Sequence, residues 1–395
     1  MREGGRRVFL AGGGTGGHLY TGLAIAEALR LARPDTVIAF STTRRPIDRR
    51  ILADQAYPVT AIAAEPFAIR PWTWPRLAAS LARTRWQTWR RFRRFCPDVV
   101  IGLGGYGSFA PVRQAQRMGV PTVVLNPDII PGRANRRLGR RAHLVCCQFE
   151  ETLDCFGPNA RLTGCPIRPS LLRASRQDGI AALGLDAARR TLLVTGASSG
   201  ARTVNRAVLA MLRAQGLPPA WQILHLTGDL DYDEVAAGYR DLKVAAVVRP
   251  YLDQMGPAYA AADLAIARAG ASTLAELLAI GVPTVFLPYP FHRDQHQMRQ
   301  ARAVEMRGAA VVVRDRPDDP GATGRELAEA VGLLLRDEVR RATIRREARR
   351  AARPDAAAAV AAEVLRLAAD HRRAAGADVD KGASAPYTPT GNVTK

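Results

Sequence analysis

The chain of 395 residues has only five cysteines. It has no apolar run that approaches the roughly 20 residues needed to cross a bilayer as a helix. Its N-terminus lacks the apolar core of a secretory signal peptide. The cysteines form no regular framework, and their odd number favours reduced thiols. These absences argue against a disulfide-rich secreted protein and a membrane-spanning protein, and they predict a cytoplasmic location.

Acidic residues are scarce relative to basic ones: 36 aspartates and glutamates stand against 57 lysines and arginines, a formal net charge of +21. Nucleic acid is one class of partner that such a charge attracts, but the chain contains no recognised nucleic-acid-binding module. The charge is concentrated between residues 69 and 95, where arginines alternate with aromatic and leucine residues and no acidic residue occurs.

This basic and aromatic segment has two interpretations. Aromatic side chains that enter the headgroup region, beside arginines that meet anionic lipid, would form a peripheral membrane surface. Alternatively, the segment is an ordinary amphipathic helix with its aromatic residues in the core and its arginines in solvent. We favour the membrane surface, with these residues contacting lipid: Trp72, Trp74, Trp86, Trp89 and Phe92.

Two glycine-rich turns carry the main functional signal. The first, Gly12 to His18, follows the strand-like run Val8 to Ala11, and the second, Gly196 to Ala201, follows Thr191 to Thr195. A strand, a tight glycine turn and a helix N-terminus together form an anion site, because backbone N–H groups point at the ligand and the helix dipole favours negative charge. Two such sites predict two facing domains with a phosphorylated ligand between them.

The first turn also contains the G-x-G-x-x-G pattern of dinucleotide-binding oxidoreductases. That interpretation expects an acidic residue after the next strand, whereas residues 36–40 run into Ser41-Thr42-Thr43-Arg44-Arg45. The arginines would suit a 2′-phosphate, so a nicotinamide cofactor stays open, as does a purely structural role of the glycines. The lysine and hydroxyl residues that end a P-loop are absent, which argues against an NTPase.

Two further glycine segments follow predicted strands, Gly102 to Ser108 and Ala267 to Glu276. Glu276 would lie about one turn into a helix, where its carboxylate could accept both hydroxyls of a ribose. The alternative is an acidic residue that complements the helix dipole.

The cluster His292 to Gln297 has the His-x-Asp-x-His spacing of a metal site. It lacks an obvious fourth ligand and follows a strand, so sugar contact is the preferred interpretation. Asp229 and Asp231 also look like a metal-binding pair, but their polar loop favours a solvated pair.

Taken together, the motifs resemble the MurG-type glycosyltransferases, which add N-acetylglucosamine to the lipid-linked muramyl-peptide precursor of peptidoglycan. The resemblance runs from about residue 6 to about residue 370 and fits in both order and spacing. It is carried by these motifs: Gly13-Gly14-Thr15-Gly16-Gly17-His18, Gly104-Gly105-Tyr106 with Ser108, Pro131-Gly132 with Ala134-Asn135-Arg136, Thr163-Gly164 with Pro166-Ile167-Arg168, Ser198 with Gly200-Ala201-Arg202, Arg268-Ala269-Gly270-Ala271 with Glu276, and Asp294 with His296-Gln297.

The resemblance implies a GT-B fold, in which two Rossmann-like α/β domains with parallel sheets face each other across a cleft. It implies a peripheral enzyme on the cytoplasmic face of the bacterial inner membrane, with UDP-GlcNAc as donor, an undecaprenyl-diphosphate-linked acceptor, no cofactor and no metal. The implied donor site comprises Thr15, Gly16, Gly17, Asp128, Arg168, Ser198, Leu252, Ala271, Ser272, Glu276, His296 and Gln297. The implied acceptor-side loop comprises Gly104, Gly105, Tyr106 and Ser108.

Three positions depart from the family pattern. Thr21 stands where the family has proline, and Gln300 stands where it has asparagine beside the sugar site. The family's His-Glu-Gln-Asn run is Leu125-Asn126-Pro127-Asp128 here, which replaces an amide with a carboxylate. These changes keep two alternatives open: a related diacylglycerol glycosyltransferase, and a catalytically idle protein that binds UDP-sugar or lipid.

The predicted reaction is an inverting transfer that needs a base for the acceptor hydroxyl. His18 is the first candidate, because the positive end of a helix dipole favours the neutral imidazole that accepts a proton. Asp128 is the second candidate. Arg168 and the helix that follows Ser198 would stabilise the leaving diphosphate.

Nearly continuous apolar strands predict parallel sheets covered on both faces. We expect an N-terminal domain over residues 1–165 that faces acceptor and membrane, and a UDP-sugar domain over residues 166–372. The last helix, about Asp355 to His371, is expected to cross back to the first domain, as it does in this family. Residues 373–395 are expected to be a disordered tail.

Overall fold

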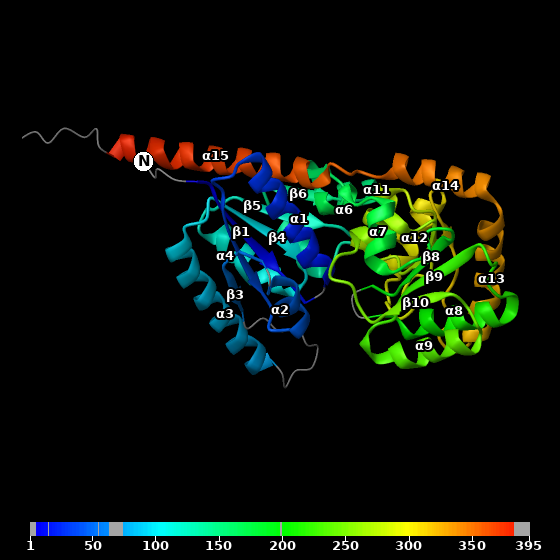
Figure 1. Ribbon diagram of the computed structural model, residues 1–395. Helices are drawn as coiled ribbons and strands as arrows, with labels where there is room; N and C mark the ends of the chain where they lie inside the picture. The colour runs from blue at the N-terminus through cyan, green and yellow to red at the C-terminus, as the bar shows by residue number, and fades with distance from the viewer. Residues whose placement is uncertain (1–4, 15, 54, 63–73, 198–199, 383–395) are drawn as a thin grey trace, which may run out of the picture.

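The computed structural model describes residues 5–14, 16–53, 55–62, 74–197 and 200–382. Two parallel sheets, each covered by helices, lie side by side and divide these residues into two α/β domains (Figure 1). The first sheet runs through the N-terminal part of the chain and ends near residue 162, and the second begins near residue 190.

The N-terminal domain contains a seven-stranded parallel sheet in the order β3-β2-β1-β4-β5-β6-β7. Its strands are β1 (Arg7–Gly12), β2 (Val37–Thr42), β3 (Val59–Ala61), β4 (Val99–Gly104), β5 (Thr122–Asn126), β6 (Leu144–Cys147) and β7 (Ala160–Leu162). Its helices are α1 (Gly16–Ala32), α2 (Pro46–Leu52), α3 (Trp74–Phe95), α4 (Tyr106–Arg117) and α5 (Arg133–Gly139), with short 3-10 helices η2 (Glu150–Cys155) and η3 (Gly157–Asn159).

The C-terminal domain contains a six-stranded parallel sheet in the order β10-β9-β8-β11-β12-β13. Its strands are β8 (Arg190–Thr195), β9 (Trp221–Leu226), β10 (Ala246–Arg249), β11 (Leu264–Ala267), β12 (Thr284–Phe286) and β13 (Val311–Val312). Its helices are α6 (Pro169–Arg173), α7 (Arg176–Leu183), α8 (Arg202–Gln215), α9 (Tyr232–Asp241), α10 (Gly256–Ala261), α11 (Ala271–Ile280), α12 (His296–Glu305), α13 (Pro320–Arg336) and α14 (Glu338–Ala351), with the 3-10 helix η4 (Asp229–Asp231).

Alternation along the strands explains why each sheet is covered on both faces. In β1, Val8 and Leu10 belong to one buried cluster while Phe9 and Ala11 belong to another, because successive strand residues point to opposite faces. In β8, Val194 and Leu193 divide between two clusters in the same way. The two-sided burial predicted from the apolar strand runs is confirmed.

Both sheets reverse their strand order at one point, between β1 and β4 in the first and between β8 and β11 in the second. In open α/β sheets, ligands bind outside the carboxyl ends of the strands that flank such a point. The four glycine-rich segments found in the sequence follow these four strands. The topology therefore brings all four to the two ligand-binding positions.

The final helix α15 (Ala356–Gly382) packs on the N-terminal domain, although the preceding α14 belongs to the C-terminal domain (Figure 1). Val360, Val364 and Ala368 are buried in the same cluster as Leu10 of β1. Arg372 forms an ion pair of 2.7 Å with the buried Asp98, beside β4. The helix continues past its predicted end at His371, through the first part of the expected tail, to Gly382. Residues 383–395 lie outside the described residues.

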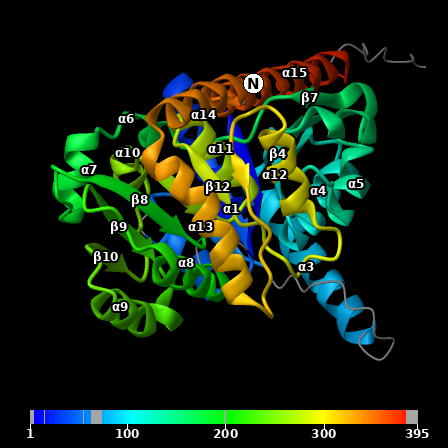
Figure 2. The ribbon, with the colours of Figure 1, turned by 90° about the vertical axis from the view of Figure 1, so that its right-hand side faces the viewer.

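Helix α3 lies at the edge of the N-terminal domain (Figures 1 and 2). Phe92 is 1% exposed, and its ring meets Phe9 edge to face at 5.0 Å. The prediction that Phe92 contacts lipid is therefore wrong, because this residue lies on the face of α3 that packs on the sheet. Trp86 and Trp89 are 55% and 44% exposed. Trp72 lies outside the described residues, as does the side chain of Trp74.

Candidate active site

His18 lies in the first turn of α1, between two glycine-rich loops. A Cβ built on Gly104 would lie 2.9 Å from its Nε2, and one on Gly105 would lie 3.1 Å from its Cε1. Both glycines have positive φ, so they supply the turn and also leave room for the imidazole. Burial lowers the pKa of His18, while Asp128, the backbone of Gly13 and Asp48 each raise it. The result favours the neutral ring.

The acceptor-side loop connects β4 to α4. Tyr106 begins α4. The guanidinium of Arg45 lies over the Tyr106 ring, 6.0 Å from the ring centre. Ser108 is fully buried and donates a hydrogen bond of 2.8 Å to the carbonyl of Gly105. Its hydroxyl therefore stabilises the turn of its own loop.

Asp128 lies in the loop after β5 and connects the two sides of the site electrostatically. The amide of Asn126 donates to the Asp128 carbonyl at 3.1 Å, and Asn135 anchors Asn126 at 3.3 Å. Burial lowers the pKa values of His18 and, in the other domain, His292, and the negative charge of Asp128 opposes this lowering in both. The carboxylate is thus near enough to influence both candidate groups.

Glu276 lies on α11 in the C-terminal domain and is 8% exposed. It accepts a hydrogen bond of 2.8 Å from the hydroxyl of Tyr259. Burial raises its pKa, and the opposing effects of Tyr259 and Arg168 are smaller. Arg168 places its guanidinium 4.6 Å from the ring centre of Tyr20 on α1. A cation and a carboxylate thus occupy the junction between the two domains.

The two domains touch where α1 and α11 begin. Ser272 donates a hydrogen bond of 3.2 Å to the carbonyl of Gly17, and the hydroxyls of Tyr20 and Tyr251 are 2.7 Å apart. Gln148 donates to the carbonyl of Ala271 at 3.4 Å. These contacts bring several predicted donor-site residues together: Gly16, Gly17, Arg168, Ala271, Ser272 and Glu276. Leu252, next to Tyr251, is half-buried against the C-terminal core. Thr15 and Ser198 lie outside the described residues.

The histidine cluster opens α12. The rings of His292 and His296 stack at 4.2 Å, and Asp294 bonds His296 Nδ1 at 2.9 Å. Gln297 accepts a hydrogen bond of 3.0 Å from the backbone of Tyr289. Among the described residues, no group of three or more His, Cys, Asp or Glu side chains is arranged to hold a metal ion. The stacked imidazole rings present their faces, not their nitrogens, to each other, so the His-x-Asp-x-His spacing does not place three ligand atoms around one point.

Two family models cover most of the chain. The glycosyltransferase family 28 N-terminal domain matches residues 8–146, and the glycosyltransferase family 28 C-terminal domain matches residues 191–360. The chain belongs to glycosyltransferase family 28.

Curated relatives agree with this family over nearly their whole length. A protein of Desulforamulus reducens is 34% identical over 365 residues, which cover 89% of this chain and 95% of the relative. A protein of Symbiobacterium thermophilum is 37% identical over 373 residues, with coverage of 93% and 98%. Both are named UDP-N-acetylglucosamine–N-acetylmuramyl-(pentapeptide) pyrophosphoryl-undecaprenol N-acetylglucosamine transferase. The predicted membership of the MurG-type family is confirmed, and the chain is a hexosyltransferase.

Solved structures agree on the fold. The crystal structure of Acinetobacter baumannii MurG superposes with a TM-score of 0.69 and 24% identity, covering 91% of this chain and 99% of that one. The UDP-GlcNAc 2-epimerase from Neisseria meningitidis, bound to UDP-GlcNAc, has a TM-score of 0.62 with 13% identity, covering 91% of this chain and 100% of that one. The predicted GT-B fold is confirmed.

Two departures from the family 28 pattern have structural consequences. Gln300 is fully buried on α12, where its amide donates to the carbonyl of Ala269. Its Oε1 has no partner among the described residues. Thr21 donates a hydrogen bond of 2.7 Å to the carbonyl of Gly17, one turn earlier in α1. A threonine here therefore ties the helix back to the domain contact.

Two ion pairs that involve buried aspartates were not predicted from the sequence. Arg268 at the end of β11 pairs with Asp315 at 2.7 Å and donates to the carbonyl of Leu287 at 2.8 Å, which links loops after three strands. Asp231, expected to be solvated, is buried and bonded to Arg202 at 2.9 Å. Sequence spacing gives no signal for such pairs, because their members are far apart along the chain.

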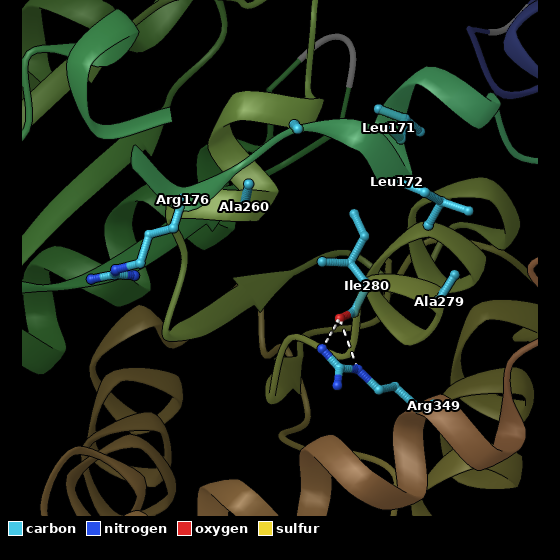
Figure 3. A pocket seen from close by; sticks show the side chains of 8 residues that line it. Leu171, Leu172, Arg176, Ala260, Ala279, Ile280 and Arg349 are labelled. Carbon is cyan, nitrogen blue, oxygen red and sulfur yellow. Dashed lines mark hydrogen bonds between the residues drawn. The ribbon is translucent and has the colours of Figure 1, made fainter. Parts of the chain in front are cut away.

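A separate cavity of about 380 Å³ lies within the C-terminal domain (Figure 3). Its wall includes Leu171, Ala260 and Ile280, and the guanidinium of Arg349 donates two hydrogen bonds to the carbonyl of Ile280, of 3.3 and 3.2 Å. None of the described residues predicted for the donor or acceptor site lines it. Its basic and apolar walls are thus independent of the family 28 active site.

Proposed function

We propose that this enzyme transfers N-acetylglucosamine from UDP-GlcNAc to the undecaprenyl-diphosphate-linked muramyl-pentapeptide, with inversion and without a metal. The observation that carries the proposal is the domain junction itself. His18 and Asp128 belong to one side, Arg168 and Glu276 belong to the other, and Gly17 touches Ser272 between them. The names of the curated relatives supply the donor and the acceptor.

In this mechanism, the acceptor hydroxyl attacks the anomeric carbon from the face opposite the leaving UDP. His18 takes the proton of that hydroxyl, because burial keeps its imidazole neutral and able to accept. Asp128 lies close enough to stabilise the imidazolium that forms. Its negative charge is attractive to that cation, so we assign it the supporting role.

The leaving UDP gains negative charge as the bond breaks. Arg168 and the N-terminus of α8 supply positive charge without a metal ion. His296 and Gln297 contact the sugar in this proposal, while Glu276 accepts the ribose hydroxyls. Arg168 is half-buried and its Nε has no partner among the described residues, so its guanidinium retains donor capacity for a phosphate.

Helix α3 is the proposed membrane surface of the enzyme. Trp86 and Trp89 are exposed. The guanidinium of Arg90 lies 5.5 Å from the ring centre of Trp86, and that of Arg93 lies 5.7 Å from the ring centre of Trp89. Such pairs present aromatic rings and positive charge together, which suits the interface of an anionic bilayer. No described helix combines the length and the apolar character needed to cross a bilayer. We propose peripheral binding at the cytoplasmic face of the inner membrane.

Substitution of Glu276 tests the donor site. Glu276→Ala should weaken UDP binding by about 1.5–3 kcal/mol, the usual contribution of a hydrogen bond to a charged group. Titration calorimetry with UDP on the folded variant measures this. Tyr259→Phe is the matched control, because it removes the hydroxyl that binds Glu276 but keeps the carboxylate. UDP affinity unchanged in Glu276→Ala would remove this residue from the site.

The function itself is tested by offering the purified enzyme two acceptors side by side. Radiolabelled UDP-GlcNAc is supplied with lipid I or with diacylglycerol, in the presence of EDTA. We expect transfer to lipid I alone. Transfer to diacylglycerol instead would support the lipid glycosyltransferase that the Asp128 and Gln300 departures leave open. Binding of UDP-GlcNAc without transfer to either would identify an idle binding protein, and activity restored only by a divalent ion would contradict metal independence.

A further inference from the structure

A buried carboxylate binds the first glycine turn from α2. Asp48 is fully buried and accepts hydrogen bonds from the backbone N–H of Gly14 at 2.9 and 3.0 Å. It also accepts from the backbone N–H of Thr43 at 3.0 Å and from the Thr43 hydroxyl at 2.6 Å. The Gly14 N–H, which the glycine pattern suggests is free for a ligand anion, is therefore occupied by an internal anion.

The same peptide unit is bonded to His18 on its other side. The backbone of Gly13 forms a hydrogen bond with the His18 imidazole, and this bond raises the His18 pKa. A bond that favours the protonated ring is one in which the ring donates, so the Gly13 carbonyl accepts. That carbonyl and the Gly14 N–H belong to one planar peptide group, so fixing one end orients the other.

Glycine is required at this point of the turn. Gly13 has a φ of +137°, and a Cβ built on it would lie 2.5 Å from Oδ2 of Asp48. The carboxylate thus occupies the space that a side chain would need. On the next carbonyl, that of Gly14, Arg45 donates a hydrogen bond of 2.8 Å. The turn is held from both directions by residues at the start of α2.

We propose that Asp48, the Gly13–Gly14 peptide and His18 form a relay in which Asp48 positions the catalytic base. The carboxylate fixes the peptide, and the peptide carbonyl holds the proton on one ring nitrogen of His18. The other ring nitrogen is then the proton acceptor, since a neutral imidazole has one donor and one acceptor nitrogen. This inference rests on the proposed role of His18 as the base.

The relay differs from a direct carboxylate–histidine pair. The peptide separates the two groups, so Asp48 receives no proton and acts through orientation and charge. The charged groups that act on His18 are Asp128, from the loop after β5, and Asp48, from α2. Asp128 faces the junction, whereas Asp48 is buried behind the turn, so the two contributions can be separated by substitution.

The decisive experiment compares Asp48→Asn with Asp98→Asn in the full-length enzyme. Asp98 is also a buried carboxylate that accepts a backbone N–H, from Arg7 at 2.7 Å, but it pairs with Arg372 and does not contact the glycine turn. The imidazole titration of His18 is followed by NMR on ¹³C-histidine-labelled protein, with the signal assigned by its absence in His18→Ala. The pH dependence of kcat and the KM for UDP-GlcNAc are measured on the same samples.

We expect Asp48→Asn to lower the His18 pKa, because an opposite charge that favours imidazolium is lost. Since the base works in its neutral form, the acid limb of the kcat profile should move to lower pH by the same amount. Turnover should fall about tenfold or more through loss of orientation, with KM for UDP-GlcNAc unchanged. Asp48→Glu, which keeps the charge, should return the limb toward the wild-type position. Asp98→Asn should lower the melting temperature without moving the limb.

An unmoved His18 titration in folded Asp48→Asn would overturn the relay and leave Asp48 a structural residue. If Asp48→Asn does not fold, Asp48→Glu is measured alone. An acid limb of its kcat profile at the wild-type pH supports the relay, and a shifted acid limb contradicts it. Failure of the proposed function is distinct, because it would appear as absence of transfer to lipid I in the wild type, and failure of the role of His18 would appear as full activity in His18→Ala. The NMR titration reads the contact between Asp48 and His18 in either case.

Discussion

Replacement of His18 by alanine should reduce turnover on lipid I by roughly 10²–10⁴, the usual contribution of a positioned general base. The affinity for UDP should barely change, because Arg168 and Glu276, the residues proposed to bind the nucleotide, belong to the other domain. Turnover is measured with radiolabelled UDP-GlcNAc, and affinity by calorimetry. His143→Ala is the matched control, since the exposed side chain of that histidine accepts a hydrogen bond from the backbone N–H of Thr122 at 3.3 Å.

The same assay separates the two candidate bases. Asp128→Asn restores an amide at a position where the family has one, so it should keep or raise activity if His18 is the base. The opposite pattern, an inactive Asp128→Asn beside a nearly normal His18→Ala, would transfer the role of base to the carboxylate. It would also indicate acceptor chemistry that has diverged from the rest of family 28.

The sequence predicts the architecture well because the relevant signals are local. Apolar strands such as Val99 to Ile101 lie next to the glycine segments that follow them, and one strand, turn and helix suffices to predict one anion-binding position. Parallel pairing then brings the four segments to the two points where strand order reverses. The fold and the family could therefore be predicted from the sequence, and the location of the site stays a prediction.

The contacts that the sequence could not predict join residues far apart in the chain. Asp48 and Gly14 are 34 positions apart, and Tyr20 and Tyr251 are 231 apart. Nothing in the local sequence Arg45-Pro46-Ile47-Asp48 distinguishes this aspartate from an exposed acidic residue that interacts with the N-terminal end of a helix dipole. Its burial is settled only when α2 packs against α1 beside the glycine turn. The sequence therefore gives no signal that an internal carboxylate accepts the hydrogen bond of the Gly14 N–H.

Phe92 shows the same limit on helix α3. Residues between Trp86 and Phe95 alternate aromatic and basic side chains so densely that composition alone favours one membrane-facing surface. The helical period separates them: Thr88, Phe92 and Phe95 face the sheet, while Trp86 and Trp89 face outward. The core interpretation thus holds for one face of the helix, while membrane contact stays a proposal for the other face, and each face can be tested separately.

Phe92→Ala should lower the free energy of unfolding by about 3–5 kcal/mol, the usual cost of deleting a buried phenylalanine. The double change Trp86→Ser with Trp89→Ser should alter it by about 0.5 kcal/mol or less per site, as expected for exposed positions. Urea unfolding measures both. The order reverses for binding to anionic vesicles: the double tryptophan variant should lose about tenfold or more in affinity, since each indole contributes apolar area to the interface, whereas folded Phe92→Ala should bind as the wild type does.

Leu230→Ser is the control for loss of an exposed apolar side chain elsewhere, because Leu230 is 89% exposed and lies in the C-terminal domain. It should leave vesicle binding unchanged. Added salt should weaken binding of the wild type, because charges at an exposed surface are screened beyond about 10 Å at 0.1 M salt. Equal vesicle affinity in the wild type and the double tryptophan variant would show that α3 does not meet the membrane. The arginines would then be a solvated face, and the enzyme would reach its lipid-linked acceptor through another surface.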